Sequence, residues 1–244
     1  MEKEAVIAAS GPHKCVNDGV VYPGQNQCSC PTRTLGPSSP AVLPCPATPE
    51  NVPKIKEYLL NRYSSSAFNV CEMQALPLMS SSPPLQLHVY PQARPVAVHV
   101  PALVPIHWQL PVKEGLDRDV RLGVLEHVPV NTPARWQSRM VLVAKHNGDP
   151  RRTVDYKNLN QHAPRQTHHT ESLWQIFSSV PEGVYKSTFD CWHGYHSLSI
   201  AESDRDLTSF ITPWGRYRYR TCLQGVLSAG DAFNDRMDRI FKEV

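Results

Sequence analysis

The chain has 244 residues, a charged fraction of 19% and a formal net charge of +3. This length could hold one large domain or two small ones, and the charge is ordinary for a soluble protein, so charge alone indicates no partner. No run approaches the roughly 18 apolar residues that a membrane span needs, and the N-terminus has neither a basic leader nor a long apolar segment. We therefore expect an intracellular protein without a signal peptide or a transmembrane segment.

Seven cysteines, an odd number without a secretion signal, argue against a disulfide framework. His13, Cys15, Cys28 and Cys30 form an H-x-C pair and a C-x-C pair, which offer ligand types that zinc accepts. The one-residue gaps strain a chelate more than the usual two-residue gap does. We favour reduced thiols in a loose segment and keep a zinc site as the alternative.

Prolines crowd into residues 31–53 and 77–111 and predict extended structure there, because the 23 prolines amount to roughly twice the usual share. We therefore divide the chain into a largely extended, proline-rich N-terminal and connector region, residues 1–104, and an ordered region, residues 105–244. Within the first region, apolar residues at helical spacing after Thr48 to Asn51 predict one short helix over 52–63.

The ordered region opens with a predicted helix and a predicted hairpin. From Trp108, apolar residues recur at helical spacing until Gly123, which predicts an amphipathic helix despite Gly115. Next come two β-rich runs, 140–145 and 151–156. They bracket Asn147-Gly148, the dipeptide that most strongly indicates a tight antiparallel hairpin.

A carboxylate follows the next two predicted elements. Apolar spacing predicts a helix over 173–180, opening at Thr170 or Ser172, and the run 184–189 predicts a strand. Asp190 ends this strand, where it is poorly placed for a core and well placed for magnesium, which prefers carboxylates together with substrate phosphates. An isolated Asp at such a position is also typical of a turn or cap, so its neighbours must decide.

Two further elements complete the ordered region. Runs over 207–212 and 217–222, on either side of Pro213-Trp-Gly215, predict a second hairpin. Ser228 and Asp231 predict the start of a final helix, whose apolar stripe is still running at Val244. This pattern suggests a truncated protein with an α+β fold.

Four motifs stand in an order that points to one family. They are SRMVLVAK from Ser138, RRTVDYKNLN from Arg151, FDCWHGYH from Phe189 and LQG from Leu223. In this order they closely resemble the reverse transcriptase in the Pol polyprotein of gypsy-like long-terminal-repeat retrotransposons, over about residues 93–244. The resemblance implies an α+β fold comprising the fingers and a partial palm of a reverse transcriptase, with an extended, proline-rich N-terminal arm.

The resemblance gives Asp190 a metal-binding role. It would be the first of three carboxylates that hold two Mg²⁺ ions for phosphoryl transfer, and Cys191 would add its backbone carbonyl at the nucleotide site. The family's other two carboxylates belong to a Tyr-x-Asp-Asp turn, and no such tetrad occurs in these 244 residues. We therefore expect one carboxylate of an incomplete two-metal site.

The resemblance also implies a nucleotide site. Lys145 and Arg151, on the two arms of the first hairpin, would bind the triphosphate of a dNTP, the alternative being two solvated charges. Tyr195 would pack under the sugar and exclude a 2′-hydroxyl, the alternative being an ordinary core aromatic. Gln224 and Gly225 would support the nucleotide and the template pair. The family's small-Pro-small run after this glycine is replaced here by Ser-Ala-Gly-Asp.

Basic residues predict contact with a primer-template, because neutralising phosphates supplies most of the non-specific affinity for nucleic acid. One group lies in the region of the first hairpin. The other alternates along a predicted strand, which places its members on one face with Tyr217 and Tyr219 on the opposite face and leaves the arginines free for a partner. The six candidates are Arg135, Arg139, Arg152, Arg216, Arg218 and Arg220.

These features together predict a fragment of an RNA-directed DNA polymerase. We expect a nucleotidyltransferase-derived chain that binds primer-template and a dNTP but is inactive alone. The expected partners are an RNA or DNA primer-template, a dNTP and the remainder of the Pol polyprotein, with no membrane. Two alternatives remain open: a non-catalytic nucleic-acid-binding module and a degenerate retroelement relic.

Overall fold

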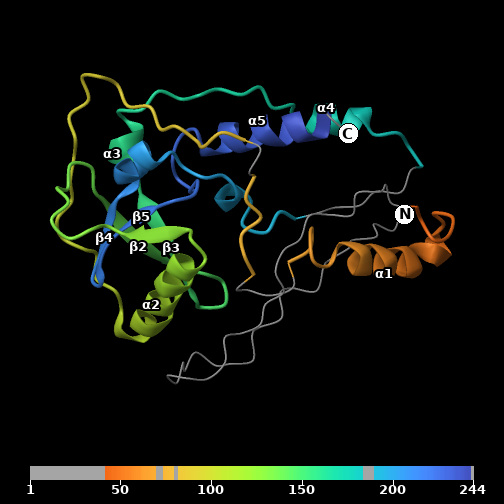
Figure 1. Cartoon of the computed structure of the whole chain (residues 1–244), viewed down its shortest axis with the longest axis horizontal. Helices are drawn as coiled ribbons and strands as arrows, with labels where there is room; N and C mark the ends of the chain where they lie inside the picture. The colour runs from red at the N-terminus through yellow and green to blue at the C-terminus, as the bar shows by residue number, and fades with distance from the viewer. Residues whose placement is uncertain (1–41, 70–73, 80–81, 184–189, 243–244) are drawn as a thin grey trace. The chain divides into compact units, whose positions relative to one another are not determined.

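The computed structural model describes residues 42–69, 74–79, 82–183 and 190–242 (Figure 1). Contacts group the chain into two compact units, one drawn from Met1–Ala75 and Phe177–Trp192, the other from Leu76–Ile176 and His193–Val244. The predicted strand at 184–189 and the cysteine-histidine cluster before residue 31 fall outside the described residues. No helix in the described ranges is long and apolar enough to cross a membrane.

The first unit contains the predicted N-terminal helix. A short 3₁₀ helix, η1 (Pro49–Asn51), leads directly into α1 (Val52–Tyr63), which confirms the predicted helix. Asn51, the residue before α1, already has helical dihedral angles, and its side chain donates to the Pro46 carbonyl at 3.1 Å. Pro53, in the first turn, fits because the amides there need no intrahelical acceptor.

In the part of the chain that the structure describes, a five-stranded mixed sheet organises the second unit. Its strands lie in the order β1-β5-β4-β2-β3. Both predicted hairpins are present as antiparallel pairs, β2 with β3 and β4 with β5, and a parallel pairing of β2 with β4 joins them. The strands are β1 (Leu125–His127), β2 (Ser138–Ala144), β3 (Pro150–Asp155), β4 (Phe210–Thr212) and β5 (Gly215–Tyr219).

The second hairpin is shorter than predicted. Residues 207 and 208 belong to a 3₁₀ helix, η3 (Glu202–Thr208), so the first arm begins only at Phe210. The Thr208 hydroxyl donates to the Arg205 carbonyl and accepts from the Tyr219 amide, which holds the end of η3 against β5. The second arm, β5, ends at Tyr219, and Thr221 pairs with Ser199 in an isolated antiparallel bridge instead.

The predicted helices of the second unit are confirmed. α2 (Ile106–Arg121) buries Val112 and Leu116 on one face, as the apolar spacing predicted. α5 (Ala229–Lys242) follows Ser228. Between them lie α3 (Lys157–Asn160) and another 3₁₀ helix, η2 (Gly194–Ser197), neither of which the sequence pattern indicated.

The predicted helix after the first hairpin is α4 (Leu173–Ser179). Ser172 is its N-cap, as expected, because the Ser172 hydroxyl accepts from the Gln175 amide at 3.3 Å. The Gln175 side chain accepts in return from the Ser172 amide at 2.7 Å, which completes a capping box.

The core of the second unit includes part of the proline-rich arm. The described residues of this segment, 76–79 and 82–104, contain no helix, and Leu85 is only 2% exposed and pairs in parallel with Ile200. Its amide donates to Ser199 and its carbonyl accepts from Ala201. The second unit therefore begins at Leu76, whereas the sequence pattern divides the chain after residue 104. The two boundaries differ because an extended segment can still bury single side chains, such as Leu85, in a core.

Candidate functional site

Two residues predicted to bind the nucleotide meet beside the first hairpin. Arg151 lies on β3, and its Nη2 donates to Oε1 of Gln224 at 3.3 Å, although 73 residues separate them in the sequence. Both side chains are exposed. Lys145 follows β2 at the tip of the hairpin, where its amide donates to the Asp149 carbonyl. The fold therefore brings Gln224 to the strand that carries Arg151, close to the hairpin tip that carries Lys145.

The backbone conformation at position 225 favours glycine, which has no side chain. Its φ is +100°, a value that other residues rarely adopt, and an added Cβ would meet the Tyr156 ring and the Val154 carbonyl oxygen at 3.6 Å. The side chain of Asn160 holds this segment with two hydrogen bonds. Its Nδ2 donates to the Gly225 carbonyl at 2.7 Å, and its Oδ1 accepts from the Leu227 amide at 3.0 Å.

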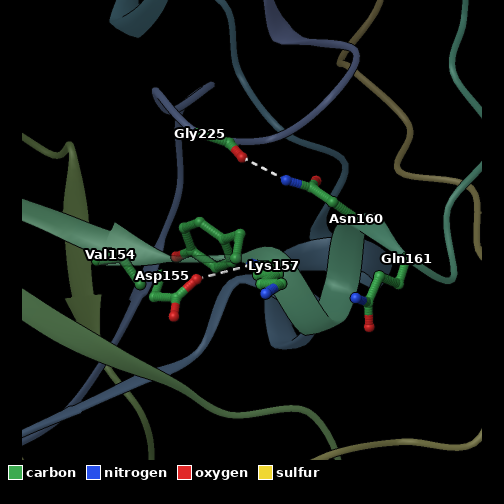
Figure 2. Close-up of a pocket in the computed structure, with 7 residues that line it drawn as sticks. Val154, Asp155, Lys157, Asn160, Gln161 and Gly225 are labelled. Carbon is green, nitrogen blue, oxygen red and sulfur yellow. Dashed lines mark hydrogen bonds between the residues drawn. The ribbon is translucent and has the colours of Figure 1, made fainter.

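A shallow groove of about 450 Å³ opens next to these residues (Figure 2). Its walls come from the end of β3, from α3 and from the backbone of Gly225. In the close-up, Asn160 points to Gly225, and Asp155 accepts from the Lys157 amide at 3.0 Å. The exposed Lys157 and Gln161 side chains also line the groove. The groove therefore combines one cation, the carboxylate of Asp155, side-chain amides and accessible backbone.

Tyr195, the predicted contact of the nucleotide sugar, belongs to η2 and is half-buried. Its ring lies 5.5 Å from that of Phe233 on α5, and a Cβ added at Gly230 would lie 3.7 Å from its hydroxyl oxygen. It also packs against the core cluster around Leu198. Gly230 belongs to the Ser-Ala-Gly-Asp segment, which therefore lies next to the tyrosine hydroxyl.

The sequence and the fold are both similar to those of known proteins. No protein-family model matches the chain. It is 26% identical over 155 residues to the retrovirus-related Pol polyprotein from the transposon gypsy of Drosophila melanogaster, covering 64% of this chain and 14% of that protein. It is 27% identical over 144 residues to the Pol polyprotein from the transposon opus of the same fly, covering 57% of this chain. The chain spans 14% of the length of both relatives.

Solved structures show the same architecture. Prototype foamy virus protease-reverse transcriptase matches with a TM-score of 0.69 at 19% identity, covering 81% of this chain and 26% of the viral chain. The foamy viral protease-reverse transcriptase in complex with an RNA/DNA hybrid matches with a TM-score of 0.67 at 19% identity, covering 81% and 25%. This chain has a reverse-transcriptase fold. The predicted resemblance to gypsy-like Pol polyproteins and the predicted α+β fingers and partial palm are confirmed.

Within this reverse-transcriptase fold, Arg216 and Arg218 alternate along β5 and share one face, Arg220 follows the end of the strand, and Tyr217 is buried. The expectation that they are free is wrong for Arg218, whose guanidinium contacts Glu126 and Asp206, each at 2.6 Å. Arg220 lies 3.6 Å from Glu126, and Arg216 donates to the Thr132 carbonyl at 2.7 Å. The cause is β1, which places Glu126 directly opposite Arg218.

The other predicted nucleic-acid contacts differ in their surroundings. Arg152 forms an ion pair with Asp119 at 2.6 Å, and both side chains are largely buried. Arg139 is exposed and donates to the Val100 carbonyl at 3.2 Å, and Arg135 is exposed. Contact of these side chains with nucleic acid stays a prediction.

Asp190 and Cys191 belong to the first unit and are exposed. Among the described residues, no group of three or more His, Cys, Asp or Glu side chains is arranged to hold a metal ion. The described residues therefore do not form the complete two-metal site that the family pattern implies. The role of Asp190 as a metal ligand stays a prediction.

Two histidines, one just before η2 and one within it, were not singled out by the sequence. The rings of His193 and His196 lie 5.3 Å apart, and burial lowers the pKa of both imidazoles. Nδ1 of His196 donates to the Cys222 carbonyl at 2.7 Å, and its ring stacks on Tyr219. His193 has a φ of +51°. The FDCWHGYH motif contains both residues, but only the fold makes them a partly buried pair next to Tyr195.

Proposed function

We propose that this chain forms the nucleotide-binding fingers and front palm of an RNA-directed DNA polymerase. The observation that carries this proposal is the contact of Arg151 with Gln224. The family pattern assigns both residues to the incoming nucleotide, and they come from distant parts of the sequence. An exposed guanidinium held by a neutral amide keeps its remaining N–H groups for an anion, and a forked guanidinium suits phosphate oxygens.

We infer that the triphosphate lies between Lys145 and Arg151. Lys145 follows the end of β2 and Arg151 is the second residue of β3, so the two cations flank the hairpin tip. The carboxylate of Asp149, also at the tip, accepts a hydrogen bond from the Asn147 side chain at 2.7 Å. A dNTP carries its negative charge on the phosphates, which two neighbouring cations favour. Tyr195 would then face the sugar, and Gln224 and Gly225 the base pair.

The groove of Figure 2 suits the template strand. Lys157 can neutralise a phosphate, and the Gln161 amide can both donate to and accept from a base edge. Gly225 presents backbone that a nucleotide can approach closely. We therefore propose that the unpaired template passes through this groove, next to the nucleotide held by Arg151 and Gln224.

We further propose that these 244 residues bind nucleotide and primer-template without catalysing polymerisation. Asp190 would supply one magnesium ligand, and when bound the ion would neutralise charge on the transferring phosphoryl group. One carboxylate does not hold two metal ions. Incorporation of labelled dTTP on an RNA template by this chain, abolished in Asp190→Ala, would contradict the proposed inactivity.

Nucleotide binding can be tested by the affinity of the chain for dTTP. Arg151→Ala and Lys145→Ala should each weaken binding about ten-fold or more, because a hydrogen bond to a charged group contributes about 1.5–3 kcal/mol. Arg121→Ala, an exposed arginine at the end of α2, is the matched control and should bind dTTP as the natural chain does. Equal affinity of all four proteins would rule out the proposed site.

Template binding requires a separate assay with an RNA/DNA hybrid that carries a single-stranded template overhang. Lys157→Ala should weaken binding and reduce its salt dependence, because each phosphate contact releases counterions. A blunt hybrid should be much less sensitive to this substitution. Hybrid binding without any dTTP binding would instead support the alternative function, a nucleic-acid-binding module.

A further inference from the structure

The hairpin that carries Lys145 and Arg151 is attached to α2 at two points. At the tip, the indole Nε1 of Trp108 donates to the Gly148 carbonyl at 3.3 Å. Further along β3, the guanidinium of Arg152 forms an ion pair with Asp119 at 2.6 Å. Figure 1 shows α2 next to this hairpin.

Both contacts come from one side of the helix. Trp108, Val112, Gly115 and Asp119 follow each other at intervals of four, three and four residues, which places them on the same helical face. Val112 is 1% exposed, so this face is packed between the two contacts. We call these four residues the hairpin-facing side of α2.

Gly115 makes room for the second contact. A Cβ at this position would lie 3.2 Å from both Nε and Nη2 of Arg152, closer than ordinary van der Waals contact. The glycine therefore lets the guanidinium lie flat against the helix and reach Asp119. The side chains of Asp119 and Arg152 are 15% and 20% exposed, so this ion pair is less screened by solvent than a surface pair.

The orientation of Arg152 determines that of Arg151. Neighbouring residues in a strand point to opposite faces of the sheet, so holding Arg152 against α2 directs Arg151 to the other face, where it meets Gln224. The tip is fixed in its turn by Trp108, between Lys145 and Arg151. The hairpin-facing side of α2 thus supports both cations of the proposed triphosphate site from behind.

We propose that Trp108 and Asp119 are positioning residues, which hold the β2–β3 hairpin in the orientation that lets Lys145 and Arg151 bind a nucleotide. The mechanical part of this inference stands on the contacts with α2, and its consequence for nucleotide binding rests on the proposed function. Neither residue needs to touch the nucleotide. Their substitution should loosen the hairpin without removing a phosphate ligand.

Hydrogen exchange of the hairpin amides tests the mechanical part. Trp108→Phe keeps an aromatic ring and removes the indole donor, and it should raise exchange at the tip amides of Lys145 and Gly148 about five-fold, since one hydrogen bond contributes about 1 kcal/mol. Asp119→Asn should raise exchange along β3. Leu110→Ala, on the same helix at a side chain that is 67% exposed, is the control and should leave the hairpin unchanged. Unchanged exchange in Trp108→Phe would overturn the proposal.

The affinity for dTTP tests the consequence. Trp108→Phe should weaken dTTP binding several-fold while its melting temperature and its hybrid affinity stay those of the natural chain. Unaltered dTTP affinity in a variant with faster hairpin exchange would overturn the positioning role. If the natural chain itself binds no dTTP, the proposed nucleotide site fails, and the exchange experiment still decides whether α2 holds the hairpin.

Discussion

Gly115 is a residue whose identity follows from a neighbour rather than from its own helix. Alanine in place of an interior helical glycine normally stabilises a protein by about 0.5–1 kcal/mol. Here the new methyl group would press on the Arg152 guanidinium. We expect Gly115→Ala to give no such gain in the free energy of unfolding, measured by urea denaturation.

The control for this prediction is the same substitution in an Asp119→Ala background. Without its carboxylate partner, Arg152 can turn away from the helix, and the alanine should then recover its gain of about 0.5–1 kcal/mol. If Gly115→Ala alone raised the free energy of unfolding by the full amount, Arg152 would be able to move away without destabilising the protein. Close approach of Arg152 would then not explain the glycine at position 115.

His196 should make stability depend on pH. Burial lowers its pKa from the ordinary value of 6.5, so the unfolded chain binds a proton more readily than the folded chain does. The neutral imidazole therefore contributes fully to the free energy of unfolding above pH 6.5. This contribution is lost as the pH falls from 6.5 towards the lowered pKa of the folded state. His193, whose pKa is lowered as well, should act in the same direction.

The measurement is the melting temperature between neutral and mildly acidic pH. His196→Gln keeps a donor for the Cys222 carbonyl and does not titrate, so its melting temperature should fall less on acidification. Parallel curves for the two proteins would show that this histidine does not contribute to the acid sensitivity.

Individual site residues were predictable only where a motif specified them. The hairpin signal placed Lys145 and Arg151 on opposite arms, and the LQG motif identified Gln224. The contact between Arg151 and Gln224 depends on the tertiary fold, which no local pattern specifies. The pairing of Arg218 with Glu126 could not be predicted, because β1 is three residues long and carries no periodic signal. A strand this short forms because of the strands it pairs with, and a local sequence pattern carries no information about them.

At the scale of elements, the segment before α4 is attached to α5 by its polar side chains. Arg165 donates to both carboxylate oxygens of Asp231, which also accepts from the His168 amide at 3.2 Å. Thr170 accepts from Asn234 at 3.0 Å. The Ser228 hydroxyl accepts from the Gln166 amide, so two residues predicted to begin the helix hold a neighbouring segment as well.

Replacing Asp231 by alanine should therefore lower the free energy of unfolding more than replacing Arg165 does. Asp231→Ala loses the ion pair and the acceptor of a backbone amide, for about 1–2 kcal/mol, whereas Arg165→Ala removes a largely exposed partner and should lower the free energy of unfolding by less. Urea denaturation of both variants gives the comparison. A larger loss in Arg165→Ala would contradict this ranking.

The same carboxylate gives a second, more acidic pH dependence. The hydrogen bond from Arg165, together with that from the His168 amide, lowers the pKa of Asp231 below 3.8. Its contribution to stability is complete above this value and is lost as the pH falls through the lowered folded pKa. Asp231→Asn should lack this component.

Elements with a repeated apolar pattern were predicted from the sequence, and elements without one were not. α2, α5 and the first hairpin have several repeats of their pattern, and α4, only seven residues long, was recognised from its apolar spacing after Thr170 or Ser172. α3, η2 and η3 have one or two turns, and a helix of that length is set by its tertiary contacts. The burial of Leu85 was missed because a proline-rich run indicates extension and says nothing about what covers it.

For the whole molecule, the point at which the polymerase-like unit begins can be tested by truncation. A chain of residues 76–244 keeps Leu85 and the backbone bonds of the arm to Ser197, Ser199 and Gln137, whereas a chain of residues 105–244 loses them. Burying one leucine contributes about 2 kcal/mol, and the shorter chain also leaves strand edges unpaired.

We expect the longer chain to melt cooperatively and the shorter one to lose its cooperative transition. Calorimetry of the two chains decides between the contact-based division at residue 75 and the division at residue 104. Equal transitions would show that the arm is dispensable for the fold.

The parallel pairing of Ser138 with Phe210 has a consequence for synthesis of the protein. The first hairpin leaves the ribosome with α3 and α4 still to come before its partner strand β4 exists. Until then the edge of β2 at Ser138 and Arg139, where β4 later pairs, stays open two residues from the exposed Val141, and an open strand edge recruits other chains. Translational pausing between Ala144 and Phe210 should therefore increase aggregation of nascent chains, which pelleting of stalled ribosome complexes can measure, and slow codons in that interval would be harmful to the yield of folded protein.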